Sequence, residues 1–160
     1  MTKRITIDLG RQSLTIWEAD QPLAVYAVST GRNGVGEQSG SGCTPRGLHR
    51  VRLRIGAGCP PGTVFRGRRP TGEIYDAALA AAHPERDWIL TRILWLTGCE
   101  PGCNRGGGVD TLRRYIYIHG CPDTEPMGEP RSHGCIRMRN RDLIELFDQT
   151  RIGMPVEIRE

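Results

Sequence analysis

The sequence predicts a single, mainly β domain with short helices that spans residues 1–160. Two observations support this fold class. The 21 glycines and 11 prolines lie mostly between short apolar runs, a distribution that favours many strands and turns over long helices. The apolar share of 38% is that of an ordinary globular domain, and the chain is long enough to bury a core without metals or disulfides.

Three strands are expected at the start of the chain. Apolar residues alternate with polar ones over 5–9 and over 14–16, and a turn around Gly10 separates the two runs. A third run extends from Leu23 to Ser29. Together these runs predict a meander of antiparallel strands.

A basic strand is expected after a glycine-rich surface loop over Gly31–Gly42. Its arginines alternate with apolar residues, in the order Arg50, Val51, Arg52, Leu53, Arg54 and Ile55. Such alternation predicts a half-buried strand whose charges face water. We therefore favour a solvated face over a nucleic-acid contact, because no nucleic-acid recognition motif accompanies the arginines.

The middle of the chain predicts a flap, a short helix and a buried strand. Glycines, prolines and arginines surround two apolar residues in Gly56–Arg69, which predicts a projecting hairpin or flap. The alanine-rich run Asp76–His83 predicts one or two helical turns that end at Pro84. The apolar run Trp88–Leu96 predicts one or two buried strands, and Cys99–Asp110 predicts a second loop.

The last third predicts a strand, a helix and a closing strand. Tyr115–His119 alternates and is expected to form a strand that ends in a histidine. Asn140 is expected to cap a helix that ends before Gly153. The apolar stripe of this helix consists of Leu143, Ile144, Leu146 and Phe147. Residues 156–158 predict a short closing strand.

The charge and the chain ends limit the classes of partner. The formal net charge of +4 is mildly basic, so it fits an acidic small substrate as readily as a nucleic acid. No apolar run is long enough to span a bilayer, so we expect no membrane partner. The basic N-terminus lacks the apolar stretch of a secretory signal. We therefore expect a cytoplasmic protein whose six cysteines stay free thiols.

Two segments, over 115–120 and 132–138, contain a thiol and two imidazoles close to glycines. A thiol is mostly protonated at neutral pH, so a nucleophilic Cys135 needs a nearby base or positive charge. His119 and His133 are the candidates. His119 is expected at a strand end, where a rigid scaffold can aim its ring, and His133 can face the same side as Cys135.

The residues around the cysteine fit acyl transfer. Gly134 permits backbone angles that let amide N–H groups at Gly134 and Cys135 converge on a developing oxyanion. Arg137 offers a bidentate donor for a substrate carboxylate close to the thiol.

These motifs closely resemble the YkuD-type L,D-transpeptidase catalytic domain. The resemblance rests on Ile118–Gly120, on Ser132–Met138 and on Thr44–Gly47, and it covers the chain from about Ile5 to Ile158. It implies a β-sandwich-like core and a groove under the Gly56–Arg69 flap. It also implies roles for the residues of the motif. Cys135 would be the nucleophile and His119 the general base, with the Gly120 carbonyl orienting the imidazole. Ser132, His133 and Gly134 would shape the site, and the amides near Gly134 and Cys135 would form the oxyanion hole.

The resemblance implies attack on the bond between diaminopimelate and a terminal D-alanine in peptidoglycan stem tetrapeptides. An amine acceptor gives a cross-link or an exchanged D-amino acid, whereas water gives an L,D-carboxypeptidase. Because a cytoplasmic enzyme meets muropeptides and soluble precursors, we expect hydrolysis during peptidoglycan recycling, without a cofactor or metal. The sequence does not predict the oligomeric state.

Two alternatives remain open at this level. His119, Cys121, His133 and Cys135 form two His-x-Cys pairs that tetrahedral zinc accepts, although their single-residue spacing differs from the common two to four residues. A wall-binding domain without activity is the other alternative, but it would normally have lost the thiol or its base. His49 and His83 are expected to be structural, and Cys121 has no assigned role.

Overall fold

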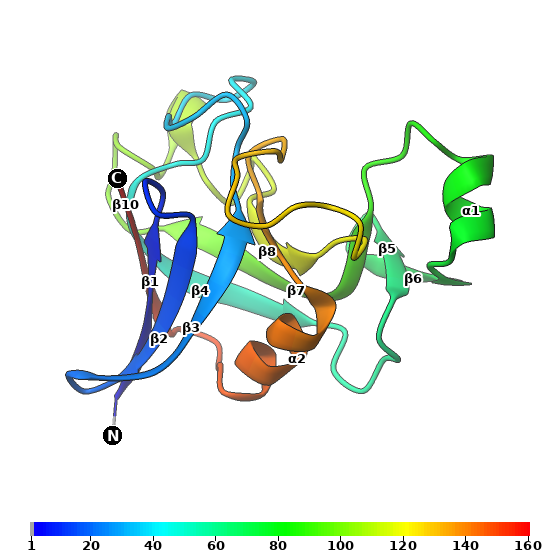
Figure 1. The fold of residues 1–160 in the computed structure, drawn as a ribbon. Helices are drawn as coiled ribbons and strands as arrows, with labels where there is room; N and C mark the ends of the chain where they lie inside the picture. The colour runs from blue at the N-terminus through cyan, green and yellow to red at the C-terminus, as the bar shows by residue number, and fades with distance from the viewer. Residues whose placement is uncertain (1) are drawn as a thin grey trace.

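The computed structural model describes residues 2–160, which form ten strands, two α-helices and a 3-10 turn over Gly107–Val109. The first strands are β1 (Lys3–Asp8), β2 (Ser13–Glu18), β3 (Gln21–Ser29), β4 (Gly47–Ile55), β5 (Thr63–Arg66) and β6 (Arg69–Ile74). Helix α1 (Ala77–Ala82) precedes β7 (Ile89–Gly98), β8 (Tyr117–Gly120) and β9 (Ile136–Met138). Helix α2 (Asn140–Asp148) and β10 (Pro155–Arg159) complete the fold (Figure 1).

Eight of these strands close into a ring. Their order is β4-β10-β1-β2-β3-β9-β8-β7, and β4 also pairs with β7. The β5–β6 hairpin extends the sheet from β7 and projects with α1 from one side of the molecule (Figure 1). The mainly β, sandwich-like fold with short helices that the sequence predicted is therefore confirmed.

The main core lies on one face of the sheet. Alternate residues of the strands point into it, among them Ile7, Leu14 and Val156, and all are almost fully buried. The apolar stripe of α2 covers this core with Leu143, Leu146 and Phe147. Helix α2 packs against β7 and β8. It therefore supports β8, the strand that carries His119, from the core side.

The flap is tied to the rest of the domain by its tip. Arg68 lies between β5 and β6, and its guanidinium stacks over the rings of Trp95 and Tyr115. The same group donates a hydrogen bond of 3.3 Å to the hydroxyl of Tyr117. Cation–π contacts of this kind contribute about 0.5–2 kcal/mol each. The flap is thus fastened beside the start of β8.

Most predicted elements are confirmed in place. The first three strands, the basic strand over 47–55 and the closing strand over 155–159 all form. The short alanine-rich helix also forms, and Asp76 caps it by accepting a hydrogen bond from the amide of Leu79. The apolar run in the middle of the chain forms one strand, β7, which is buried over most of its length.

The predicted N-cap at Asn140 is wrong. Arg139 precedes α2, and Asn140 is the first helical residue. The Asn140 amide donates a 2.9 Å hydrogen bond to the carbonyl of Cys121 and accepts one of 2.5 Å from Thr91. These lateral contacts tie α2 to the site strands, so the side chain is not available to cap its own helix.

The predicted strand start at Tyr115 is also displaced. Tyr115 has a φ of 56°, in the left-handed region, and this breaks the extended backbone before β8. Strand β8 therefore begins at Tyr117.

None of the helices formed by residues 2–160 has the length and apolar character needed to cross a membrane.

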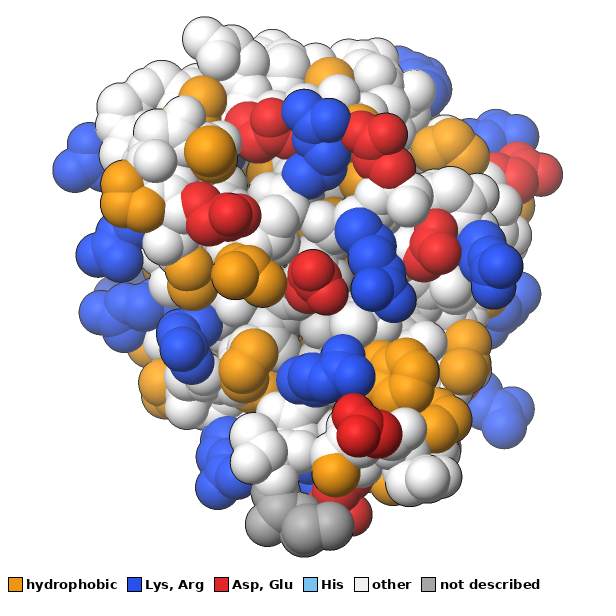
Figure 2. Space-filling model, turned by 90° about the vertical axis from the view of Figure 1, so that its left-hand side faces the viewer, with side chains coloured by type: hydrophobic (Ala, Val, Ile, Leu, Met, Phe, Trp, Pro, Cys, Tyr) orange, Lys and Arg blue, Asp and Glu red, His pale blue; other side chains and the backbone are white. Residues whose placement is uncertain are grey.

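Charges of both signs are interspersed on the face that carries β1 and β10 (Figure 2). Blue and red side chains are mixed across it, and apolar side chains lie between them singly or in small groups. Such a mixture is typical of a solvated protein surface.

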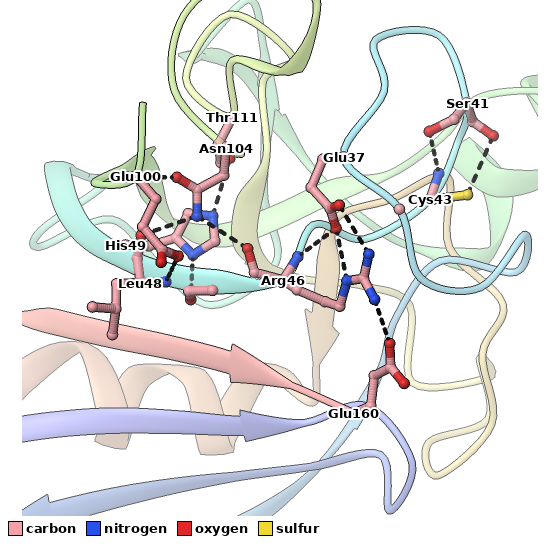
Figure 3. A network of polar contacts seen from close by, with 12 residues as sticks. Glu37, Ser41, Cys43, Arg46, Leu48, His49, Glu100, Asn104, Thr111 and Glu160 are labelled. Atoms are coloured by element: carbon pink, nitrogen blue, oxygen red, sulfur yellow. Dashed lines mark hydrogen bonds and ion pairs between the residues drawn. The ribbon is translucent and has the colours of Figure 1, made fainter. Parts of the chain in front are cut away.

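A buried histidine connects β4 to the loop that follows β7. The ring of His49 donates through Nδ1 to the Gly47 carbonyl at 3.0 Å, and its Nε2 accepts from the Thr111 hydroxyl at 3.0 Å (Figure 3). Asn104 joins the same network through the carbonyls of Arg46 and Leu48. Burial lowers the pKa of His49 to about 4.

We expect this histidine to make the fold sensitive to acid. Because the folded state holds the neutral ring, its contribution is complete above the ordinary pKa of 6.5 and is lost as the pH falls through about 4. The loss in the free energy of unfolding should be on the order of 3 kcal/mol. Urea unfolding of the wild type and of His49→Gln across this range measures it. An identical pH dependence in both proteins would contradict the assignment.

Candidate active site

Strands β8 and β9 place the predicted site residues on one face. The two strands run parallel, with His119 opposite Arg137 and Ile118 opposite Ile136. Ile118 and Ile136 point into the main core and are fully buried. Because side chains alternate along a strand, His119 and Arg137 share the opposite face, and Cys135, two residues before Arg137, joins them. The site therefore lies outside the core that supports it.

His119 is held in one tautomer by its own backbone. Its Nδ1 lies 2.6 Å from the carbonyl oxygen of Gly120, which can only accept, so Nδ1 carries the proton and Nε2 has a free lone pair. Burial lowers the pKa of His119, so the ring is neutral at neutral pH. A neutral imidazole with a fixed orientation is the form that can take up a proton.

Gly120 is required by packing. A side-chain carbon at this position would overlap Asn140 Oδ1 and would lie 2.6 Å from the carbonyl oxygen of Leu90. Glycine therefore lets β8 approach β7 and α2 closely at the point where its carbonyl orients His119.

Cys135 is partly buried beneath the flap. Its Sγ donates to the carbonyl of Tyr115 at 3.2 Å and accepts from the amide of Tyr117 at 3.3 Å. The thiol packs at the edge of an apolar cluster that contains Phe65 and Ile93. Burial raises the pKa of Cys135 to about 12, although the Tyr117 amide acts in the opposite direction. The resting thiol is therefore protonated.

Within residues 2–160, no hydrogen bond joins the Cys135 sulfur to the His119 ring. Cys135 directly precedes β9, two residues before Arg137, which is the partner of His119 in the parallel pairing. Attack by Cys135 with His119 as the base therefore requires the sulfur to leave its contact with the Tyr115 carbonyl and turn toward the ring.

A tight turn presents the cysteine. The hydroxyl of Ser132 donates to the carbonyl of Cys135 at 2.6 Å and accepts from the amide of Gly134 at 3.1 Å. Gly134 has a φ of 124°, which an L side chain rarely adopts. In this state the Gly134 amide is therefore engaged, whereas the Cys135 amide has no acceptor within residues 2–160. Of the two predicted oxyanion donors, the Cys135 amide is the one that is free.

Thr44 fixes the turn from the opposite loop. Its hydroxyl donates to the Gly134 carbonyl at 2.8 Å and accepts from the Gly31 amide at 2.8 Å. The Arg114 guanidinium donates to the neighbouring carbonyl of Cys43 at 2.7 Å. Because Thr44 is fully buried, these bonds leave the turn little freedom.

His133 and Arg137 meet at a carboxylate that the sequence motif does not contain. One oxygen of Asp87 lies 3.2 Å from Arg137 Nη2, and the other lies 3.3 Å from His133 Nδ1. The exposed fractions of the side chains are 9% for Arg137 and 68% for His133. Asp87 thus links a buried cation to an exposed imidazole.

Three cavities surround these residues. The first, of about 210 Å³, is lined by Arg137, His133 and Asp87 among others. The second, of about 410 Å³, lies beside Arg114, Tyr115 and His133. The third, of about 470 Å³, is lined by residues 64–67 of the flap together with Asp87, so it forms the groove expected there.

The zinc alternative requires four ligands to converge. Within residues 2–160, no three His, Cys, Asp or Glu side chains are grouped so that they could hold a metal ion. The Cys121 thiol instead donates to the carbonyl of Met138 at 3.6 Å, and His133 pairs with Asp87. This arrangement does not fit a zinc site.

The family model of the L,D-transpeptidase catalytic domain, named YkuD, matches residues 2–158. The chain belongs to this family. The resemblance that the sequence motifs indicated is thereby confirmed. No curated protein matches the chain in sequence.

Solved L,D-transpeptidases share the fold. An L,D-transpeptidase from Xylanimonas cellulosilytica has a TM-score of 0.62 at 20% identity, covering 99% of this chain and 60% of that one. L,D-transpeptidase 3 from Mycobacterium tuberculosis, in complex with a faropenem-derived adduct, has a TM-score of 0.62 at 17% identity, with coverage of 99% and 60%. An Enterococcus faecium L,D-transpeptidase has a TM-score of 0.59 at 15% identity, with coverage of 99% and 50%. The chain thus spans between 50% and 60% of the length of these chains.

Sequence reasoning did not identify several residues of this L,D-transpeptidase domain that contact the site. Asp87 directly precedes the apolar run of β7, and that position beside a buried strand was its only signal. Arg114 and the backbone of Tyr115 lie in a loop without a motif. These residues come together through the pairing of strands that are far apart in the sequence.

We expect the reactivity of Cys135 to rise steeply with pH. Its pKa of about 12 means that the thiolate, the reactive form, becomes about tenfold more abundant with each pH unit from about pH 7 to about pH 10. Iodoacetamide labelling with peptide mass spectrometry measures the rate at this residue. A plateau near neutral pH would show a preformed thiolate and contradict this expectation.

Proposed function

We propose that this domain catalyses cysteine-dependent acyl transfer at the bond between diaminopimelate and D-alanine in peptidoglycan stem tetrapeptides, with water as the acceptor. The observation that carries the proposal is the fixed tautomer of His119 on the same strand face as Cys135. Membership of the L,D-transpeptidase family supports the reaction class. The substrate is peptidoglycan peptide, as the family resemblance implies.

The first step forms a thioester. As the Cys135 sulfur attacks the carbonyl carbon of diaminopimelate, its proton passes to Nε2 of His119. The Gly120 carbonyl accepts from Nδ1–H throughout and stabilises the imidazolium that forms. The tetrahedral adduct then collapses, the C–N bond breaks, and the nitrogen of D-alanine takes the proton from His119.

The negative charge on the tetrahedral adduct needs a donor. The free Cys135 amide supplies one, and the Gly134 amide supplies a second if Ser132 releases it. One such donor contributes a factor of roughly 10²–10³ in rate. The Thr44 hydroxyl and the left-handed backbone of Gly134 hold these amides in place beforehand.

The second step releases the shortened peptide. His119 removes a proton from water, the resulting oxygen nucleophile attacks the thioester, and the sulfur leaves with the proton from the imidazolium. The products are a tripeptide with a free carboxylate and free D-alanine. The resting site is restored with a neutral thiol and a neutral ring.

The cellular location is part of the proposal. We place the enzyme in the cytoplasm, where it would trim tetrapeptides to tripeptides during peptidoglycan recycling. The six cysteines are all free thiols, which is compatible with a reducing compartment. Cell fractionation tests this location, and enzyme found outside the inner membrane would contradict it.

Conversion of Cys135 to alanine should abolish the release of D-alanine from a purified tetrapeptide, because the thioester forms on the Cys135 sulfur. His119→Gln should lower kcat by roughly 10²–10⁴ because the general base is lost. Chromatography or mass spectrometry of the tripeptide measures both effects. Cys59→Ala, which removes a neighbouring thiol of the same apolar cluster, is the matched control and should retain activity. Unchanged turnover in Cys135→Ala would refute the mechanism.

The acceptor can be decided with a competing amine. We expect the tripeptide to remain the main product when a D-amino acid is added in excess, because water resolves the thioester. Mass spectrometry distinguishes the tripeptide from an exchanged tetrapeptide. A predominance of exchanged peptide, or of cross-linked dimers, would assign the domain to transpeptidation instead.

A further inference from the structure

The cavity of about 210 Å³ beside Arg137 is lined by charges of both signs. Its acidic residues are Glu85, Asp87 and Glu125, and its basic residues are Arg86 and Arg137. A ligand that is only an anion would face three carboxylates there. A ligand that is only a cation would face two guanidinium groups. The lining therefore favours a group that carries both charges at once.

Arg137 is buried with most of its hydrogen-bonding capacity unused. A guanidinium carries five N–H donors. Within residues 2–160, the side chain of Arg137 makes one hydrogen bond, from Nη2 to Asp87 at 3.2 Å. It also forms a longer ion pair, of 3.7 Å, with Glu125. Its Nε is buried and has no partner among these residues. Because buried polar groups are normally satisfied, this side chain has donors available for a ligand that enters the cavity.

The acidic residues hold the guanidinium and also offer acceptors of their own. Asp87 is 43% exposed and Glu125 is 40% exposed, so their carboxylates reach the open side of the cavity. Each can accept a hydrogen bond from an ammonium group that enters beside Arg137.

The position of the cavity connects it to the thiol. Arg137 lies in β9, two residues after Cys135, so the two Cα atoms are at most about 7 Å apart. A volume of about 210 Å³ is smaller than a typical drug-sized site of about 300–1,000 Å³. The cavity therefore fits the end of a side chain rather than a whole peptide.

We propose that this cavity is a subsite for a zwitterionic α-amino-acid head group, with Arg137 binding its carboxylate and Glu125 and Asp87 binding its ammonium. The inference rests on the proposed function and deepens it, because the distal centre of diaminopimelate is such a head group. A few methylene groups separate that centre from the carbonyl that Cys135 attacks. Arg137, Asp87 and Glu125 are then specificity-determining residues.

Binding to the inactive Cys135→Ala protein tests the subsite without turnover. Three tetrapeptides differ only at the third residue: diaminopimelate, lysine with an ammonium alone, and diaminopimelate with its distal amine acetylated. Calorimetry should give a Kd for the first peptide that is about tenfold or more below the other two, as expected for one charge-assisted contact. Equal Kd values for all three peptides would overturn the proposal.

Two substitutions in the same background identify the residues. Arg137→Gln should remove the advantage of diaminopimelate over lysine, and Glu125→Gln should reduce its advantage over the acetylated peptide. Arg141→Gln, an exposed position on α2, is the matched control and should change neither ratio. A preference that survives in Arg137→Gln would overturn the assignment. If that variant does not fold, the three-peptide comparison with Arg137 intact still decides.

The failure of this inference differs from the failure of the proposed function. Wild-type protein that releases D-alanine equally well from the diaminopimelate and lysine peptides would refute the subsite and retain the reaction. Protein that binds diaminopimelate selectively but releases D-alanine from no peptide would retain the subsite and refute the reaction.

Discussion

The parallel register of β8 and β9 is the constraint on which the site depends. It places Ile118 and Ile136 in the core and leaves His119 and Arg137 on the opposite face, continued by Cys135. A slip of one residue in either strand would exchange the two sets, burying the imidazole or the thiol in the apolar core. The core residues therefore fix the catalytic geometry, because the free energy of burying them selects the register. Gly120 contributes by letting β8 lie directly against β7 and α2.

Burial keeps both reacting groups, the thiol and the imidazole, in their neutral forms. It raises the pKa of Cys135 and lowers that of His119, so both groups are neutral before substrate binds. An ion pair of thiolate and imidazolium is thus not the resting state. The proton moves as the sulfur attacks, when the oxyanion donors and the Gly120 carbonyl stabilise the charges that develop.

The sequence predicted the fold class and most elements because alternation and turn residues are local signals. Strand β2 and helix α1 are defined by their own residues and caps. The site was predictable only as far as the motif reached, which covers Ile118–Gly120 and Ser132–Met138. Asp87 and Arg114 act through contacts across the fold, and neither belongs to the motif. The N-cap prediction at Asn140 failed for the same reason, since tertiary partners compete for a side chain that would otherwise serve its own helix.

The charge of the Arg137 cavity and the chemistry of the thiol are linked through Asp87. The negative charge of Asp87 raises the pKa of both His119 and Cys135, whereas Arg137 lowers both. A ligand that brought only a carboxylate to this cavity would add to the effect of Asp87 and make the thiolate harder to form. A ligand that brought only an ammonium would make the imidazolium less stable. A zwitterionic head group adds no net charge, so it can bind beside the site without shifting the balance on which proton transfer depends.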